Sequence, residues 1–221
     1  MRNFKMNKVM LTISAAAVSS LFAVSTASAG FTGLEYENVE NNMDGYTTWR
    51  IYAGTDGEVD AVYGDGANTL TVNSDSGFFN ATGTGATAMD NNNAFWAVFP
   101  SNEFDSMVTI GMTHTNSGGS MSDIGIDFTA FNAGGNIVTD NGSWYSTPDQ
   151  PNVLAVDGRV LIMQLTIADS DHAYGVISLQ GKDADASTNW NEDGLAFDTV
   201  PAPGALALLG LAGFAARRRR K

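Results

Sequence analysis

The sequence predicts an all-β protein: one antiparallel domain of β-sandwich or jelly-roll type, with a hydrophobic helix at each end of the chain. Three observations support this class. Apolar and polar residues alternate with a period of two in short segments, Asp-Gly and Asn-Gly pairs recur, and helical periodicity is missing between the two ends. We divide the chain into a signal peptide (1–29), a β-domain (30–199) and a C-terminal segment (200–221).

The first 29 residues have the order of a secretory signal peptide. Arg2, Lys5 and Lys8 precede an apolar run, and the small residues Ala27-Ser28-Ala29 follow it. The run is short for a membrane span, which needs about 20 apolar residues. We therefore expect export through the Sec machinery and cleavage after Ala29, with an uncleaved anchor as the alternative.

Strands are expected wherever apolar residues alternate. In residues 107–114, Val108, Ile110, Met112 and His114 share one face. Residues 159–168 are apolar on nearly both faces, which is typical of a central strand. The same reading predicts strands over residues 49–53, 70–72 and 124–128.

Turns and loops are expected between these strands. Asp-Gly and Asn-Gly pairs supply the positive φ angles of tight hairpin turns, and they occur at residues 44–45, 56–57, 65–66, 141–142, 157–158 and 193–194. Two polar stretches, residues 80–93 (NATGTGATAMDNNN) and 183–193 (DADASTNWNED), are expected to be loops.

The C-terminal segment joins a proline pair to an apolar run and a cationic tail. Val200, Pro201, Ala202 and Pro203 precede thirteen small or apolar residues, 204–216. The chain then ends on Arg217, Arg218, Arg219, Arg220 and Lys221. Cations resist translocation, so this tail is expected to hold the chain in the inner membrane, with a plain C-terminal anchor as the alternative reading.

This arrangement resembles the PEP-CTERM sorting signal of Gram-negative bacteria, over about the last 22 residues. Pro201-Ala202-Pro203 stands where the family has Pro-Glu-Pro. The resemblance implies processing by an exosortase-type enzyme, transient membrane association through residues 204–216, and delivery to the cell surface or extracellular matrix. It also implies surroundings rich in exopolysaccharide and other surface proteins, as in biofilms.

Charge and cysteine content limit the partners of the exported part. All 24 acidic residues lie between Glu35 and Asp198, and only Arg50, Arg159 and Lys182 oppose them there, which gives a formal charge of −21. Such a surface repels the phosphates of nucleic acids, so we expect no nucleic-acid partner. The chain has no cysteine, which excludes disulfides and thiolate metal sites.

Acidic loops raise the question of a metal. Asp183, Asp185 and Ser187 match the first three ligand positions of a calcium loop. Thr188 stands where an EF-hand requires Gly, and Gly194 where it requires Glu, which excludes an EF-hand. A looser calcium site and a merely solvated loop both remain open. We expect no other cofactor.

The sequence contains no motif of an enzyme class. It lacks Gly-x-Ser-x-Gly, His-Glu-x-x-His and a glycine-rich phosphate loop, so we expect a non-enzymatic structural or interaction protein. The alternative is a carbohydrate-binding module in which exposed Trp144, Tyr145 and Trp190 stack on sugars, while Trp49 and Trp96 lie in the core. A secreted hydrolase is the third reading.

Overall fold

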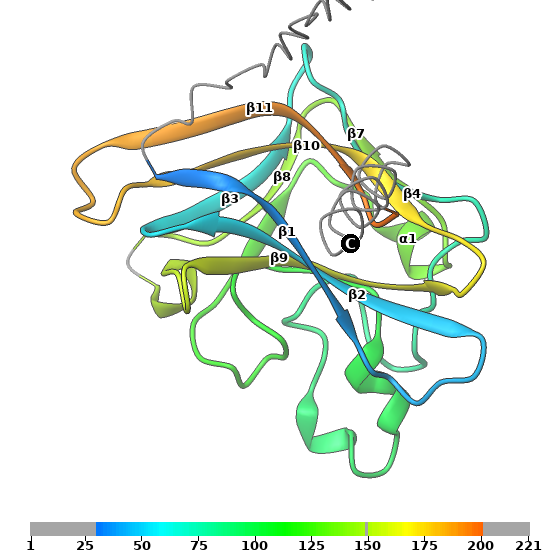
Figure 1. The fold of residues 1–221 in the computed structure, drawn as a ribbon. Helices are drawn as coiled ribbons and strands as arrows, with labels where there is room; N and C mark the ends of the chain where they lie inside the picture. The colour runs from blue at the N-terminus through cyan, green and yellow to red at the C-terminus, as the bar shows by residue number, and fades with distance from the viewer. Residues whose placement is uncertain (1–29, 149, 201–221) are drawn as a thin grey trace, which may run out of the picture.

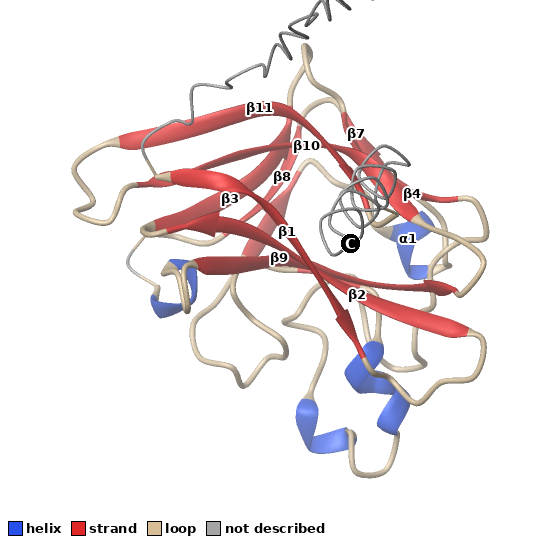
Figure 2. Ribbon diagram, in the orientation of Figure 1, coloured by secondary structure: helices blue, strands red, loops and turns tan. Residues whose placement is uncertain are grey.

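The computed structural model describes residues 30–148 and 150–200. This part of the chain is all-β, as predicted, and its strands form two antiparallel sheets. Helical segments are short; the α-helix α1 covers only Thr129–Asn132 (Figure 2). The predicted signal peptide, with Ala27 and Ala29, and the segment from Pro201 to Lys221 lie outside the described residues.

The smaller sheet has the strand order β1-β2-β9-β5. Its strands are β1 (Phe31–Val39), β2 (Tyr46–Thr55), β9 (Arg159–Ala168) and β5 (Met107–Val108). A hairpin turn at Asp44-Gly45 joins β1 to β2, and Gly45 has the positive φ of 83° that the sequence predicts there.

The larger sheet contains two extended rows beside β10, and each row consists of two short strands in line with a break between them. The strands β3 (Glu58–Gly64) and β4 (Leu70–Ser74) follow one another along the same edge of β10 (Ala173–Lys182). Beyond them, β8 (Gly142–Tyr145) pairs with β3 and β7 (Ile137–Thr139) with β4. The sheet is completed by β11 (Asn189–Asp198) beside β10 and β6 (Ser122–Ile124) beside β8.

One hydrophobic core lies between the two sheets, with β10 and β11 on one side of it and β2 and β9 on the other (Figure 1). The indole of Trp144 on β8 crosses the core and donates to the carbonyl of Thr109, 3.2 Å away. Residues contributed by both sheets include Ile51, Val62, Leu70, Met107, Ile162, Met163, Leu165, Ile177 and Leu179, all less than 2% exposed.

Strand β9 confirms one prediction, and β5 corrects another. Residues 160–167 are buried throughout, as expected for a strand covered on both faces. The strand predicted over 107–114 ends at Val108. Gly111, at a φ of +65°, turns the chain out of the ladder, although Ile110 and Met112 stay buried.

Glycines also explain two further corrections. The strand predicted over 124–128 ends where β6 ends, at Ile124, because Gly125 adopts a φ of +70°. Asp193-Gly194 is not a turn: it lies inside β11, close to an irregularity in the register with β10. Asp157 and Gly158, with φ of 53° and 80°, do form the predicted tight turn before β9.

The two predicted loops differ from expectation, the first in its buried residues and the second in its length. Residues 80–92 form no strand, but Ala86, Ala88 and Asn91 are buried beneath the surface. The second loop ends earlier than predicted, because β11 begins at Asn189 and takes Trp190 into the sheet.

Candidate functional site

The aromatic set predicted to bind sugars is divided between the two faces of the larger sheet. Trp144 is 0% exposed and Trp190 is 1% exposed, so neither indole can stack on a ligand, and the prediction is wrong for both. Tyr145 follows Trp144 on β8 and therefore points to the opposite, outer face, where it is half-buried.

Trp190 is held in the core by close contacts from both sheets. Its ring stacks on Phe31 of β1 at a centroid distance of 5.6 Å. On the neighbouring strand it faces Gly181, where an added Cβ would lie 2.6 Å from the indole. A side chain at Gly181 would clash with the indole and, even more closely, with the backbone carbonyl of Glu58, so the burial of Trp190 beside this strand requires a glycine.

The two tryptophans expected in the core are partly exposed. Trp49 lies on β2 at an intermediate exposure, and Trp96 follows a short 3₁₀ turn on the surface. Trp96 donates through its indole nitrogen to Asn91, at 2.9 Å, and meets the ring of His114 edge-on. Trp49 still packs against the core, so its predicted position is confirmed in part, whereas the prediction for Trp96 is corrected.

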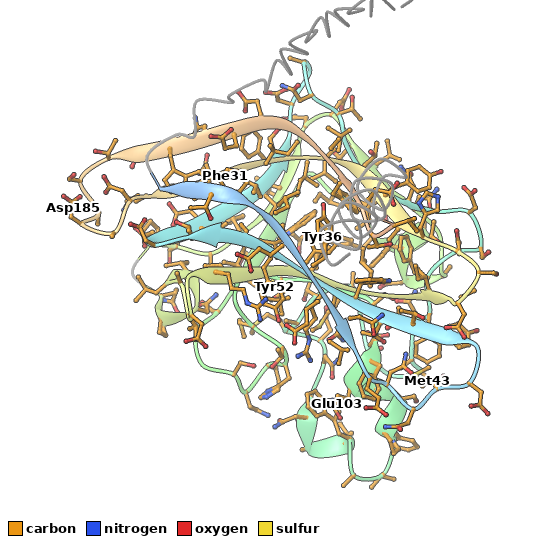
Figure 3. All side chains as sticks on the ribbon, in the orientation of Figure 1. Phe31, Tyr36, Met43, Tyr52, Glu103 and Asp185 are labelled. Atoms are coloured by element: carbon orange, nitrogen blue, oxygen red, sulfur yellow. The ribbon has the colours of Figure 1, made fainter. Side chains whose placement is uncertain are left out.

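The acidic loop at Asp183 and Asp185 joins β10 to β11, and Asp185 lies at its outer tip (Figure 3). The carboxylate of Asp183 accepts hydrogen bonds from the backbone N–H groups of Ser187 and Thr188, at 3.0 and 3.1 Å. Asp185 accepts from the N–H of Ser187 at 2.9 Å, and its pKa is lowered by hydrogen bonds from Ser187. These carboxylates stabilise the turn itself.

The described residues contain no cluster of three or more His, Asp or Glu side chains placed to hold a metal ion. In the same part of the chain, no helix combines the length and apolar character that crossing a membrane requires. Val200 is described and 51% exposed, whereas the other predicted sorting residues lie outside the described part.

The outer face of the larger sheet carries a groove of about 430 Å³, which we call the outer-face groove. It lies where β3 and β8 pair, between β6 on one side and β10 on the other. Its described lining residues are Asp60, Ala61, Tyr63, Ile124, Ser143, Tyr145, Ser146, Thr147, Pro148 and Gln180.

The groove results from the placing of large beside small side chains. On the outer face Tyr63 pairs with Ser143, and Tyr145 pairs with Ala61. The two tyrosines therefore occupy diagonal positions on adjacent strands, which are typically about 7–8 Å apart, with small residues between them. The tyrosines form the higher sides of the groove and the small residues form its floor.

Tyr63 is fixed in orientation by a carboxylate of β11. Its hydroxyl donates to Oδ1 of Asp193 at 2.5 Å. Burial, together with this acceptor, raises the pKa of the phenol well above its usual range. The hydrogen bond favours one orientation of the ring, which lowers the entropy cost of stacking a ligand on it.

Asp60 contributes a buried carboxyl group to the groove. It is the extra residue of a β-bulge, because Gln180 pairs with Ala61 while Gly181 pairs with Val59. Asp60 is 9% exposed, and its Oδ1 is covered and has no hydrogen-bond partner in the described part of the chain. Burial, and then the charge of Glu58, raises the pKa of this carboxyl to about 6, against a lowering effect of Lys182.

Two other surface hollows each contain a charged group that is already paired. One, of about 440 Å³, includes Asp90, whose carboxylate accepts from the N–H and hydroxyl of Thr87. The other, of about 280 Å³, includes Arg159, which lies over the ring of Tyr52 and pairs with Glu37 at 3.0 Å. Of the three hollows, the outer-face groove is the one that joins two aromatic rings to a buried carboxyl with an unpartnered oxygen.

Sequence reasoning found Tyr145 but missed Asp60, Tyr63 and Gln180. The alternation of Ala61 and Tyr63 with Val62 is a signal that could have placed Tyr63 on a strand face. Nothing in the sequence reveals the bulge at Asp60.

Comparison with known protein families, with curated proteins and with solved structures finds no match for this chain.

Proposed function

We propose that this chain is an exported protein of the cell surface or extracellular matrix with a non-enzymatic, structural or interaction role. Sec-dependent export removes the signal peptide after Ala29, and a PEP-CTERM-like signal from Val200 onward directs sorting by an exosortase-type enzyme. Residues 204–216 and the following cations hold the chain in the inner membrane until processing near Pro201, Ala202 and Pro203.

The observation that carries this proposal is the position at which the folded domain ends relative to the sorting motif. Strand β11 ends at Asp198, and Thr199, 4% exposed, is fastened to β10: its N–H donates to the carbonyl of Ala173 at 2.9 Å. Its hydroxyl accepts from the N–H of Ala173 at 3.0 Å. This boundary supports the division of the chain at residue 200, one residue before Pro201.

The same boundary has a second fastening. The ring nitrogen Nδ1 of His172 lies 2.8 Å from Oδ1 of Asp198, and the N–H of Val200 donates to that oxygen at 2.8 Å. The pKa of His172 is raised, first by this hydrogen bond. A processing enzyme would therefore receive a motif that begins directly at a fixed strand end.

We also assign the domain to the β-sandwich class, because its two antiparallel sheets lie on either side of one core. The non-enzymatic role is proposed from the sequence, which contains no Gly-x-Ser-x-Gly, no His-Glu-x-x-His and no glycine-rich phosphate loop.

Intact-mass measurement of the protein released at the cell surface tests the proposal. We expect a mature form that begins at Gly30 and has lost Arg217, Arg218, Arg219, Arg220 and Lys221. Replacing these five residues with Ser is expected to change how the chain is retained and processed, whereas replacing the half-buried Lys182 on β10, which pairs with Glu58 at 3.4 Å, should not. Mature extracellular protein that still carries the Arg cluster would contradict exosortase sorting.

A further inference from the structure

We infer that the outer-face groove binds a neutral polysaccharide, whose sugar rings stack on Tyr63 and Tyr145 and whose hydroxyl groups donate hydrogen bonds to the carboxylate of Asp60. This goes beyond the proposed function, because binding in vitro depends on the groove and not on how the chain is sorted.

The carboxyl group of Asp60 needs a hydrogen-bond donor. A carboxyl that is 9% exposed, with an oxygen that lacks a partner, is costly unless a donor is supplied from elsewhere. The backbone carbonyl of Asp60 is satisfied by the N–H of Ser146 at 2.8 Å, so the missing partner is that of the side chain. Asp60 lines the groove, and because only its Oδ1 is covered, Oδ2 is the carboxylate oxygen to which a ligand there can donate.

A sugar can supply that donor. Sugars offer rows of hydroxyl donors on ring edges and apolar C–H groups on ring faces, and a site for them needs acceptors beside aromatic rings. The groove supplies both, since Tyr63 and Tyr145 lie on the face that also presents Asp60 and the exposed amide of Gln180.

The negative charge of the domain favours an uncharged ligand. The residues between Glu35 and Asp198 carry a formal charge of −21, and Asp193 adds a carboxylate at the hydroxyl of Tyr63. An anionic polymer would be repelled over its whole approach, whereas a neutral one would not. The ligand class that fits both the groove and its surroundings is thus an uncharged polysaccharide.

The open shape of the groove indicates a long ligand. The groove lies on an open sheet face, and its rim includes side chains that are well exposed, such as Ile124 at 65%. Two aromatic rings in diagonal positions on neighbouring strands present a row of stacking surfaces rather than an enclosed pocket. Such a surface suits an internal stretch of a polymer chain.

Affinity electrophoresis of the full-length chain, kept soluble in mild detergent, tests this inference. Native gels are cast with mixed-linkage β-glucan, galactomannan or dextran as neutral probes, and with alginate as the anionic one. We expect retardation by at least one neutral polymer and none by alginate. Absence of retardation in all three neutral gels, or retardation in alginate alone, would overturn the inference.

Variants assign the binding to the groove. Tyr145→Ala is expected to lower the association constant roughly tenfold, and the double variant with Tyr63→Ala to abolish retardation. Tyr145→Phe keeps the stacking ring and is expected to bind within about twofold of the unaltered protein. Asp60→Asn, which keeps the size of the side chain, is expected to weaken binding about threefold to tenfold.

Tyr174→Ala is the matched control, because Tyr174 is a half-buried tyrosine on the same outer face, toward the opposite end of β10. It should leave retardation unchanged. Circular dichroism of each variant identifies those that fail to fold, and Asp60→Asn, which keeps the size of the side chain, still tests the assignment if an alanine variant does so. Retardation that survives the double substitution in a folded protein would place the binding elsewhere and refute the assignment.

Discussion

The two faces of the larger sheet use aromatic residues for opposite purposes, and Trp144 and Tyr145 show this most directly. These neighbours on β8 point to opposite sides, so one indole fills the core and the phenol next to it borders an open groove. On the inner face, aromatic groups are covered by the smaller sheet, as Trp190 is by Phe31. On the outer face, small partners such as Ala61 and Ser143 leave the rings uncovered.

Whether an aromatic residue lies in the core or on the outer face therefore depends on which side of the strand it occupies and on its cross-strand partners. The polarity of its neighbours in sequence does not decide it. Trp190 lies among Asn, Glu and Asp residues and is nevertheless buried at 1%. The predictions below test this contrast between a structural inner face and a binding outer face.

The largest effect is expected from truncating the inner face. Trp144→Ala removes a fully buried indole and its hydrogen bond to Thr109, and should lower the free energy of unfolding by about 3–5 kcal/mol. Urea unfolding followed by circular dichroism measures this. Tyr145→Ala on the outer face is the matched control and should cost less than about 1 kcal/mol. Equal losses for the two substitutions would remove the distinction between the faces.

The next effect contrasts two buried carboxyls. Asp105 is 0% exposed and sealed in the interior, and burial, as the first cause, raises its pKa to about 7. The unfolded chain releases this proton near pH 4, so the native state holds more protons between about pH 4 and 7, and stability falls as pH rises through that window. Asp60 acts in the same direction over a narrower window, since its pKa is about 6.

Asp105→Asn is therefore expected to gain stability relative to the unaltered protein between pH 4 and 8, by on the order of a few kcal/mol. Urea unfolding at several pH values measures the difference. Asp60→Asn should show a smaller dependence. A stability difference for Asp105→Asn that stays constant with pH would mean that the carboxyl titrates normally.

A smaller effect is expected on ligand binding. Because the charged form of Asp60 is the stronger acceptor, affinity for a neutral polysaccharide should fall several-fold as the pH drops through about 6, as the carboxyl becomes protonated. Asp60→Asn should bind with little pH dependence over the same range. Isothermal titration with the polymer that retards the protein most is the measurement, and identical profiles for the two proteins would exclude Asp60 from the site.

The smallest effect is expected from calcium at the acidic loop between β10 and β11. Its carboxylates, unlike that of Asp60, already accept hydrogen bonds. Since Asp183 and Asp185 already accept backbone N–H groups, calcium should raise the melting temperature no more than sodium chloride of equal ionic strength. Differential scanning calorimetry measures both shifts. A larger shift with calcium that Asp183→Asn and Asp185→Asn remove would instead support the looser calcium site.

The all-β class, the burial of residues 160–167 and the turns at Asp44-Gly45 and Asp157-Gly158 followed from the sequence, because each depends on local alternation or a local φ requirement. The lengths of β5 and β6 did not follow from the sequence. Gly125 at positive φ directly follows the end of β6, and β5 ends at Val108, before Gly111 at positive φ turns the chain away from β9.

The site was predictable only in part for a related reason. Tyr145 was found because it follows a turn signal, whereas Asp60 enters the groove through a bulge that shifts the strand by one residue and leaves both Val59 and Val62 in the core. A bulge is defined by the partner strand, which lies more than 100 residues away in sequence. No pattern within β3 itself encodes it.

The most direct test of the contrast between the two faces is carbene footprinting read by peptide mass spectrometry, with and without the neutral polysaccharide that retards the protein most. We predict labelling of Tyr63 and Tyr145 in the free protein and protection of both on binding. Tyr174 should be labelled equally in both samples, and Trp144 and Trp190 in neither. Unchanged labelling of Tyr63 and Tyr145 on binding, or protection centred on Tyr174, would contradict the assignment of the outer-face groove as the binding site.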